Sequence, residues 1–81
     1  MYTANPYRRT NPRTVRGARK KGWHIVKVTD RTVENFNTSW CGVEMWTARQ
    51  AKGNWCSSFM LREFAFENVE DASWFTMKWG I

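Results

Sequence analysis

Histidine and cysteine are the side chains with the widest chemical reach in this sequence, since they can act as bases, nucleophiles and metal ligands. The chain has 81 residues, with one histidine, His24, and two cysteines, Cys41 and Cys56. Metal sites usually contain short clips such as Cys-x-x-Cys, whereas these three residues are separated by 17 and 15 positions. No serine or cysteine motif accompanies His24. We therefore expect a non-enzymatic protein with no catalytic residue, metal or cofactor.

Carboxylates gather in one short stretch toward the C-terminal end of the chain. This acidic cluster consists of Glu63, Glu67, Glu70 and Asp71. Acid–base catalysis needs carboxylates positioned in a cleft, but these residues precede and begin a predicted helix. We expect them to form an exposed acidic patch, which is a candidate contact surface for another protein.

Basic residues are concentrated in the first 22 positions, which contain no Asp or Glu. They are Arg8, Arg9, Arg13, Arg16, Arg19, Lys20 and Lys21, seven of the thirteen basic residues in the chain. Residues 23–81 carry six basic and seven acidic residues, so the net charge of +6 belongs to the leader. A charge this concentrated favours a polyanionic partner, either nucleic acid or an acidic protein surface.

The composition of this leader predicts a flexible arm over residues 1–22 and a compact body over residues 23–81. Pro6 and Pro12 interrupt it and Val15 is almost its only apolar residue, so it cannot offset the entropy of ordering. Cations on such an arm would bind phosphates by releasing counterions, and Tyr7 could stack on exposed bases. A tail that only improves solubility remains the alternative.

The body has too few cysteines for a disulfide framework, so free thiols are expected. No apolar run approaches the roughly 18 residues of a membrane span, and no apolar segment of a signal peptide follows the basic leader. We expect no membrane association. The acid-free, Arg-rich leader also has the composition of an organellar transit peptide, although its two prolines disfavour the required helix.

Aromatic and β-branched residues predict three strands. Residues 23–29 form the first, and residues 33–39 follow as a short helical turn or a loop. Residues 40–49 and 55–66 are predicted to pair as a hairpin around Lys52-Gly53-Asn54, because Gly and Asn are frequent in turns. In the favoured register Glu44 lies opposite Arg62, which avoids the like-charge pair that a shift by one residue would create.

The last segment carries the start and stop signals of a helix. Asn68 is a suitable N-cap, acidic residues occupy the first turn and Gly80 follows the last. Val69, Ala72, Phe75 and Trp79 would form one apolar stripe, although a strand over residues 73–79 competes with this interpretation. We predict an α+β fold, with a three-stranded antiparallel sheet covered on one face by the C-terminal helix and an extended basic N-terminal arm.

The ending Asp71-Ala-Ser-Trp-Phe-Thr-Met-Lys-Trp79, preceded by Phe64-Ala-Phe-Glu-Asn68, resembles the C-terminus of short, mostly uncharacterised proteins of tailed bacteriophages. Their shared pattern is Asp-Ala-x-x-Phe-x-x-Lys/Arg-Trp, and the resemblance covers residues 64–79. It implies that Asp71 and Ala72 begin the helix and that Phe75 and Trp79 pack on the sheet. It implies no activity, but it favours a viral protein located in the host cytoplasm or the virion.

Three functions follow as hypotheses. The first is non-specific nucleic-acid binding through the basic arm. The second is a virion structural role in a capsid or tail, where the arm of a homo-oligomer or shell neighbour would lie on the acidic cluster. The third is inhibition of a host protein through exposed aromatic residues that form an interface hot spot. The candidate residues for that interface are Trp40, Trp46 and Trp55.

Overall fold

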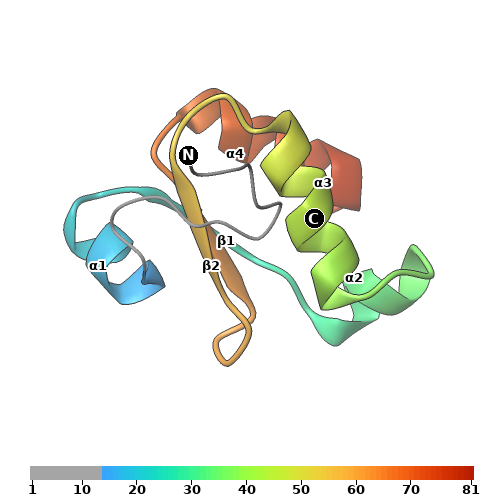
Figure 1. Ribbon diagram of the computed structural model, residues 1–81. Helices are drawn as coiled ribbons and strands as arrows, with labels where there is room; N and C mark the ends of the chain where they lie inside the picture. The colour runs from blue at the N-terminus through green and yellow to red at the C-terminus, as the bar shows by residue number, and fades with distance from the viewer. Residues whose placement is uncertain (1–13) are drawn as a thin grey trace, which may run out of the picture.

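A three-stranded antiparallel sheet lies between helices in the computed structural model, which describes residues 14–81 (Figure 1). The elements in chain order are α1 (Val15–Lys20), β1 (His24–Lys27), α2 (Asp30–Asn35), α3 (Trp40–Gln50), β2 (Trp55–Ser58), β3 (Glu63–Phe66) and α4 (Val69–Trp79). The strand order is β1-β3-β2, and the central β3 is antiparallel to both neighbours. The predicted α+β class is confirmed.

Side chains of β3 alternate between two buried layers. Phe64 and Phe66 point toward α3 and α4, and the ring of Phe75 from α4 lies 4.7 Å and 5.0 Å from theirs. Ala65 points the other way, where it packs with Cys56 of the neighbouring strand and with α1. Because successive residues of a strand face opposite sides, β3 is buried on both faces. Helices therefore cover both sides of the sheet, not one.

Helix α4 has the caps that the sequence predicts. The Asn68 side chain accepts a hydrogen bond from the backbone N–H of Glu70 at 2.8 Å, and Gly80 ends the helix in the left-handed conformation with φ of 66°. Ala72, Phe75 and Trp79 are buried, which confirms most of the predicted stripe. Its first member, Val69, is 55% exposed.

Residues 40–50 form helix α3, so the strand predicted for residues 40–49 is wrong, as are the predicted hairpin and its register. Ser39 caps the helix by accepting a hydrogen bond from the N–H of Gly42 at 3.1 Å. Val43 and Thr47 are buried at a spacing of four, which is a helical period. The β-branched and aromatic residues favoured a strand, but their spacing suits a helix that packs one face on the sheet. The segment Lys52-Gly53-Asn54 connects α3 to β2.

The hairpin in the structure joins β2 to β3 through residues 59–62. Ser57 lies opposite Phe64, and Arg62 turns the chain with φ of 56°. Arg62 forms an ion pair with Asp30 at 3.1 Å, and its guanidinium lies 4.0 Å from the ring centre of Phe59. The turn therefore depends on a non-glycine residue at positive φ, for which sequence gives a weak signal.

Helix α1 corrects the prediction of an arm that ends at residue 22. Thr14 caps it, Gly22 ends it with φ of 81°, and Val15 and Ala18 are fully buried against Cys56 and Ala65. Val15 and Ala18 are three residues apart, so one face of a single helical turn is apolar even though the segment is rich in arginine. Residues 14–22 belong to the folded body. Residues 1–13 lie outside the described part of the chain.

Candidate nucleic-acid interface

Helix α1 fixes the basic residues that follow Thr14. Arg16 and Lys20 are four residues apart, so they share the side of the helix that faces away from the sheet. Both are exposed, as are Arg19 and Lys21. Basic residues in the last turn also suit the negative end of the helix dipole. We name the set Arg16, Arg19, Lys20 and Lys21 the α1 basic surface.

One cation of the α1 basic surface forms an ion pair with a carboxylate of the same chain. The Arg19 guanidinium donates to both oxygens of Glu63 on β3, at 2.9 Å and 3.0 Å. The Arg19 side chain is 53% exposed, so the pair contributes only about 0.2–1 kcal/mol. Within residues 14–81, Arg16, Lys20 and Lys21 have no ion pair. Three cations on a positioned helix are therefore available to a ligand.

The remaining predicted residues of the basic arm lie outside the described residues. They are Tyr7, Arg8, Arg9 and Arg13. The structure thus places four of the seven predicted cations on one surface and leaves the contribution of the other three as a prediction.

The acidic cluster does not form the solvated four-carboxylate patch that the sequence suggested. Glu63 binds Arg19, and Glu67 accepts a hydrogen bond from the Asn54 side chain at 2.9 Å. Asp71 is only 6% exposed, because α4 turns it toward the connection between α3 and β2. Of the four carboxylates of the acidic cluster, only Glu70 is exposed without a partner among the described residues. This weakens the idea that a neighbour's arm docks on four free carboxylates.

Asp71 instead holds the connection between α3 and β2. Its carboxylate accepts hydrogen bonds from the backbone N–H of Lys52, at 3.1 Å and 3.2 Å to its two oxygens, and from that of Gly53 at 2.8 Å. Hydrogen bonds to a charged acceptor contribute about 1.5–3 kcal/mol each, and their loss would leave two N–H groups without this acceptor. The sequence signal was ambiguous, because an acid in the first turn also suits the helix dipole.

We expect Asp71→Ala to lower the free energy of unfolding by about 2–4 kcal/mol, because two backbone donors lose their shared acceptor. Urea denaturation followed by circular dichroism measures the change. Glu70→Ala is the matched control, since it removes the same charge from the same helical turn and should cost at most about 1 kcal/mol. Equal losses in the two variants would contradict the structural role of Asp71.

The tryptophans predicted as an interface do not form an exposed patch. Trp55 is 5% exposed and stacks on Phe64, and Trp40 and Trp46 are half-buried against the core. Trp55 is therefore a core residue and the other two pack against the core, because the short body needs large rings to fill its interior. The exposed aromatic side chains in residues 14–81 are instead Trp74 on α4, which is 65% exposed, Phe59 at the hairpin tip and Phe36 after α2.

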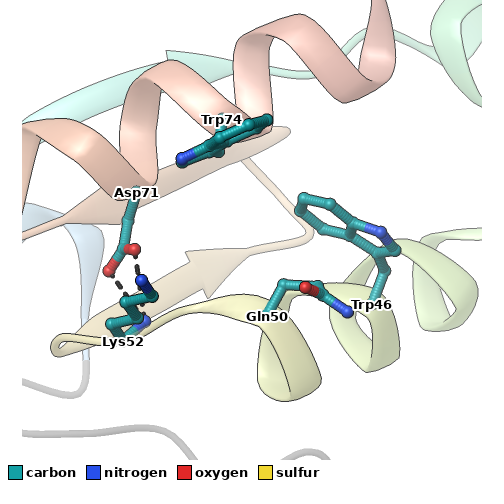
Figure 2. Close-up of a pocket in the computed structure, with 5 residues that line it drawn as sticks. All are labelled: Trp46, Gln50, Lys52, Asp71 and Trp74. Atoms are coloured by element: carbon teal, nitrogen blue, oxygen red, sulfur yellow. Dashed lines mark hydrogen bonds between the residues drawn. The ribbon is translucent and has the colours of Figure 1, made fainter.

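Trp46 and Trp74 border a cavity of about 270 Å³ between α3 and α4, which we name the Trp46–Trp74 pocket (Figure 2). Gln50, Lys52 and Asp71 complete its lining. Figure 2 shows the two indoles on opposite sides of the open space, with Lys52 beside Asp71. Sequence reasoning missed this pocket because it assigned Trp46 to a strand. The helical spacing of residues 43–50 was the signal that could have placed it.

A buried polar pair also escaped sequence reasoning. The Ser57 hydroxyl of β2 donates to the Glu44 carboxylate of α3 at 2.5 Å, and both residues are buried. A serine beside a carboxylate could suggest a nucleophile with its base, but a substrate has no access to buried side chains. The pair ties α3 to the sheet, a structural role consistent with its burial.

The residues first considered for chemistry are dispersed. His24 is exposed on β1, Cys41 is an exposed free thiol, and Cys56 is buried. Within residues 14–81, no group of three His, Cys, Asp or Glu side chains is arranged to hold a metal ion. No helix in the same range has the length and apolar character needed to cross a membrane.

Comparisons with known proteins add no family to these observations. No protein-family model matches the chain, and neither a curated protein nor a solved structure matches it.

Proposed function

We propose that this chain is a small, non-enzymatic nucleic-acid-binding protein of bacteriophage type, which acts in the host cytoplasm or in the virion. The observation that carries the proposal is the α1 basic surface. Its cations lie on a helix that Val15 and Ala18 fix to the sheet, and three of them have no ion pair within residues 14–81. The phage setting rests on the resemblance of residues 64–79.

The mechanism is electrostatic. Cations that approach phosphates release condensed counterions, so affinity falls with salt and depends little on sequence. Cations on a fixed helix should bind more tightly than cations on a flexible arm, because less conformational entropy is lost on binding. The net charge of +6 further attracts polyanions over distance and raises association rates at low salt.

The triple variant Arg16→Gln, Lys20→Gln, Lys21→Gln tests the proposal. If each cation meets one phosphate, the slope of log affinity against log salt should fall in magnitude by about 2.7 on duplex DNA, since each neutralised phosphate contributes about 0.9. Fluorescence anisotropy with a labelled duplex at several salt concentrations measures this slope. The loss should be similar for duplexes of unrelated sequence.

A second triple variant separates the α1 basic surface from net charge alone. Arg31→Gln, Arg49→Gln, Lys78→Gln removes the same charge from exposed positions on α2, α3 and α4. We expect it to change the salt slope much less. Equal slopes for the two triple variants would show that α1 is not the binding surface and would overturn the proposal.

A second candidate function is contact with another protein, either a virion neighbour or a host protein. It is favoured by the exposed hairpin tip, where Phe59, Met60 and Leu61 are 54%, 88% and 47% exposed. Consecutive exposed apolar residues are typical of protein contacts. Replacing all three with serine would release the chain from purified virions or from a captured host protein if this function holds. The change would leave nucleic-acid binding intact if α1 carries the function.

A further inference from the structure

The Trp46–Trp74 pocket has one fixed wall and one exposed wall. Trp46 on α3 packs its ring 6.1 Å from that of Phe75 and 5.8 Å from that of Trp79, so the core holds it in place. Trp74 on α4 is 65% exposed and contributes little to the core. No ring contact joins these two indoles within the described residues, and the cavity of about 270 Å³ separates them (Figure 2). The space between them is open to a ligand.

The lining selects the chemistry of that ligand. Indole faces stack on flat aromatic groups, and every nucleobase has such a face. The Gln50 amide offers both a donor and an acceptor to the edge of a base. Lys52 lines the same pocket, and a lysine ammonium suits a phosphate.

Asp71 does not turn the pocket into a site for cations. Its carboxylate oxygens accept hydrogen bonds from the backbone N–H groups of Lys52 and Gly53, and the cationic residue Lys52 also lines the pocket. A methylated ammonium group would therefore enter a pocket that is already lined by a lysine, in a chain with net charge +6. An anionic ligand with a flat ring is the better match.

We propose that the Trp46–Trp74 pocket binds one unstacked base of a single-stranded nucleic acid, with an adjoining phosphate at Lys52. This inference rests on the proposed function and adds a preference for single strands. The pocket and the α1 basic surface lie on opposite sides of the sheet (Figure 1). A strand that engages both must pass around its edge, so the two surfaces should contribute independently.

The experiment compares two single-stranded probes with the full chain. One is an oligothymidylate of about 15 nucleotides, and the other has the same phosphates but abasic sugars. The variant is Trp74→Ala, and the control is Met77→Ala, a 71% exposed apolar residue on the same helix that does not line this pocket. We expect Trp74→Ala to weaken binding of oligothymidylate roughly 5- to 100-fold, which is the usual range for one stacked base.

Binding of the abasic probe should change less than about twofold in Trp74→Ala, and Met77→Ala should bind both probes as the unmodified chain does. An unaltered midpoint of thermal unfolding shows that Trp74→Ala is folded. A normal affinity of this variant for oligothymidylate, or an equal loss on both probes, would overturn the pocket inference while the α1 proposal stands. If Trp74→Ala abolishes binding and the α1 triple variant does not change it, the proposed function fails and the pocket remains.

Discussion

Deletion of residues 1–21 should unfold this protein because it removes helix α1, whereas deletion of residues 1–13 retains that helix. The longer deletion removes α1, whose residues Val15 and Ala18 are 1% and 0% exposed. It also uncovers Cys56 and Ala65, which are completely buried. Full burial of one valine side chain contributes about 1.5–3 kcal/mol, and a domain of this size has a stability of only about 3–10 kcal/mol. The free energy lost with this whole layer is therefore comparable with the total free energy of unfolding.

Circular dichroism with urea as denaturant tests this expectation. The chain of residues 22–81 should show no cooperative transition, and the chain of residues 14–81, which retains α1, is the comparison. A point variant, Val15→Asp, gives an independent check, because it places a charge in the layer formed by α1, Cys56 and Ala65. Equal transitions for the two truncated chains would mean that α1 is not part of the body.

This result also decides how binding experiments are designed. If deletion of residues 1–21 abolishes binding to nucleic acid, the loss of folding explains it as well as the loss of cations does. Only substitutions on the surface of α1, or the shorter deletion, separate the two causes. The shorter deletion additionally measures what Arg8, Arg9 and Arg13 contribute to binding.

Phe75→Ala should be the most damaging single substitution in the core. The ring is 0% exposed and lies 4.7 Å from that of Phe64, 5.0 Å from that of Phe66 and 6.4 Å from that of Trp79. Replacing a buried phenylalanine with alanine costs about 3–5 kcal/mol, because transfer energy is lost and a cavity remains. A loss of this size is a large part of the free energy of unfolding of the body.

The matched control is Met77→Ala on the same helix, where a 71% exposed side chain should change stability by no more than about 0.5 kcal/mol. Urea denaturation of both variants gives the two values. A loss below about 1 kcal/mol for Phe75→Ala would contradict its place at the centre of the core.

The parts of the fold that could be predicted are those in which local signals and periodicity agree. Asn68, Gly80 and the spacing of Ala72, Phe75 and Trp79 all indicated α4, and the structure contains it. In residues 40–50 the two signals conflicted, since residue types favoured a strand and the spacing of Val43 and Thr47 favoured a helix. Packing against the sheet resolved the conflict in favour of the helix.

The candidate site was harder to predict because it depends on contacts between distant segments. Residues 14–22 are rich in arginine and have only one apolar turn, at Val15 and Ala18. The sequence therefore predicted that α1 was part of a flexible arm. The Arg19–Glu63 pair joins residues 44 positions apart, and no local pattern indicates it. The Trp46–Trp74 pocket exists only once α3 and α4 lie side by side. The sequence predicted the net positive charge of the N-terminal segment. Which cations share one surface became clear only from the three-dimensional fold.

An NMR titration of the full chain with a short duplex at low salt tests the central claim most directly. We expect the largest changes in backbone amide shifts within residues 14–81 to occur at Arg16 to Lys21, and added salt to reverse them. Shift changes confined to the hairpin tip at Phe59 to Arg62, or no changes at α1 under conditions of full binding, would contradict it.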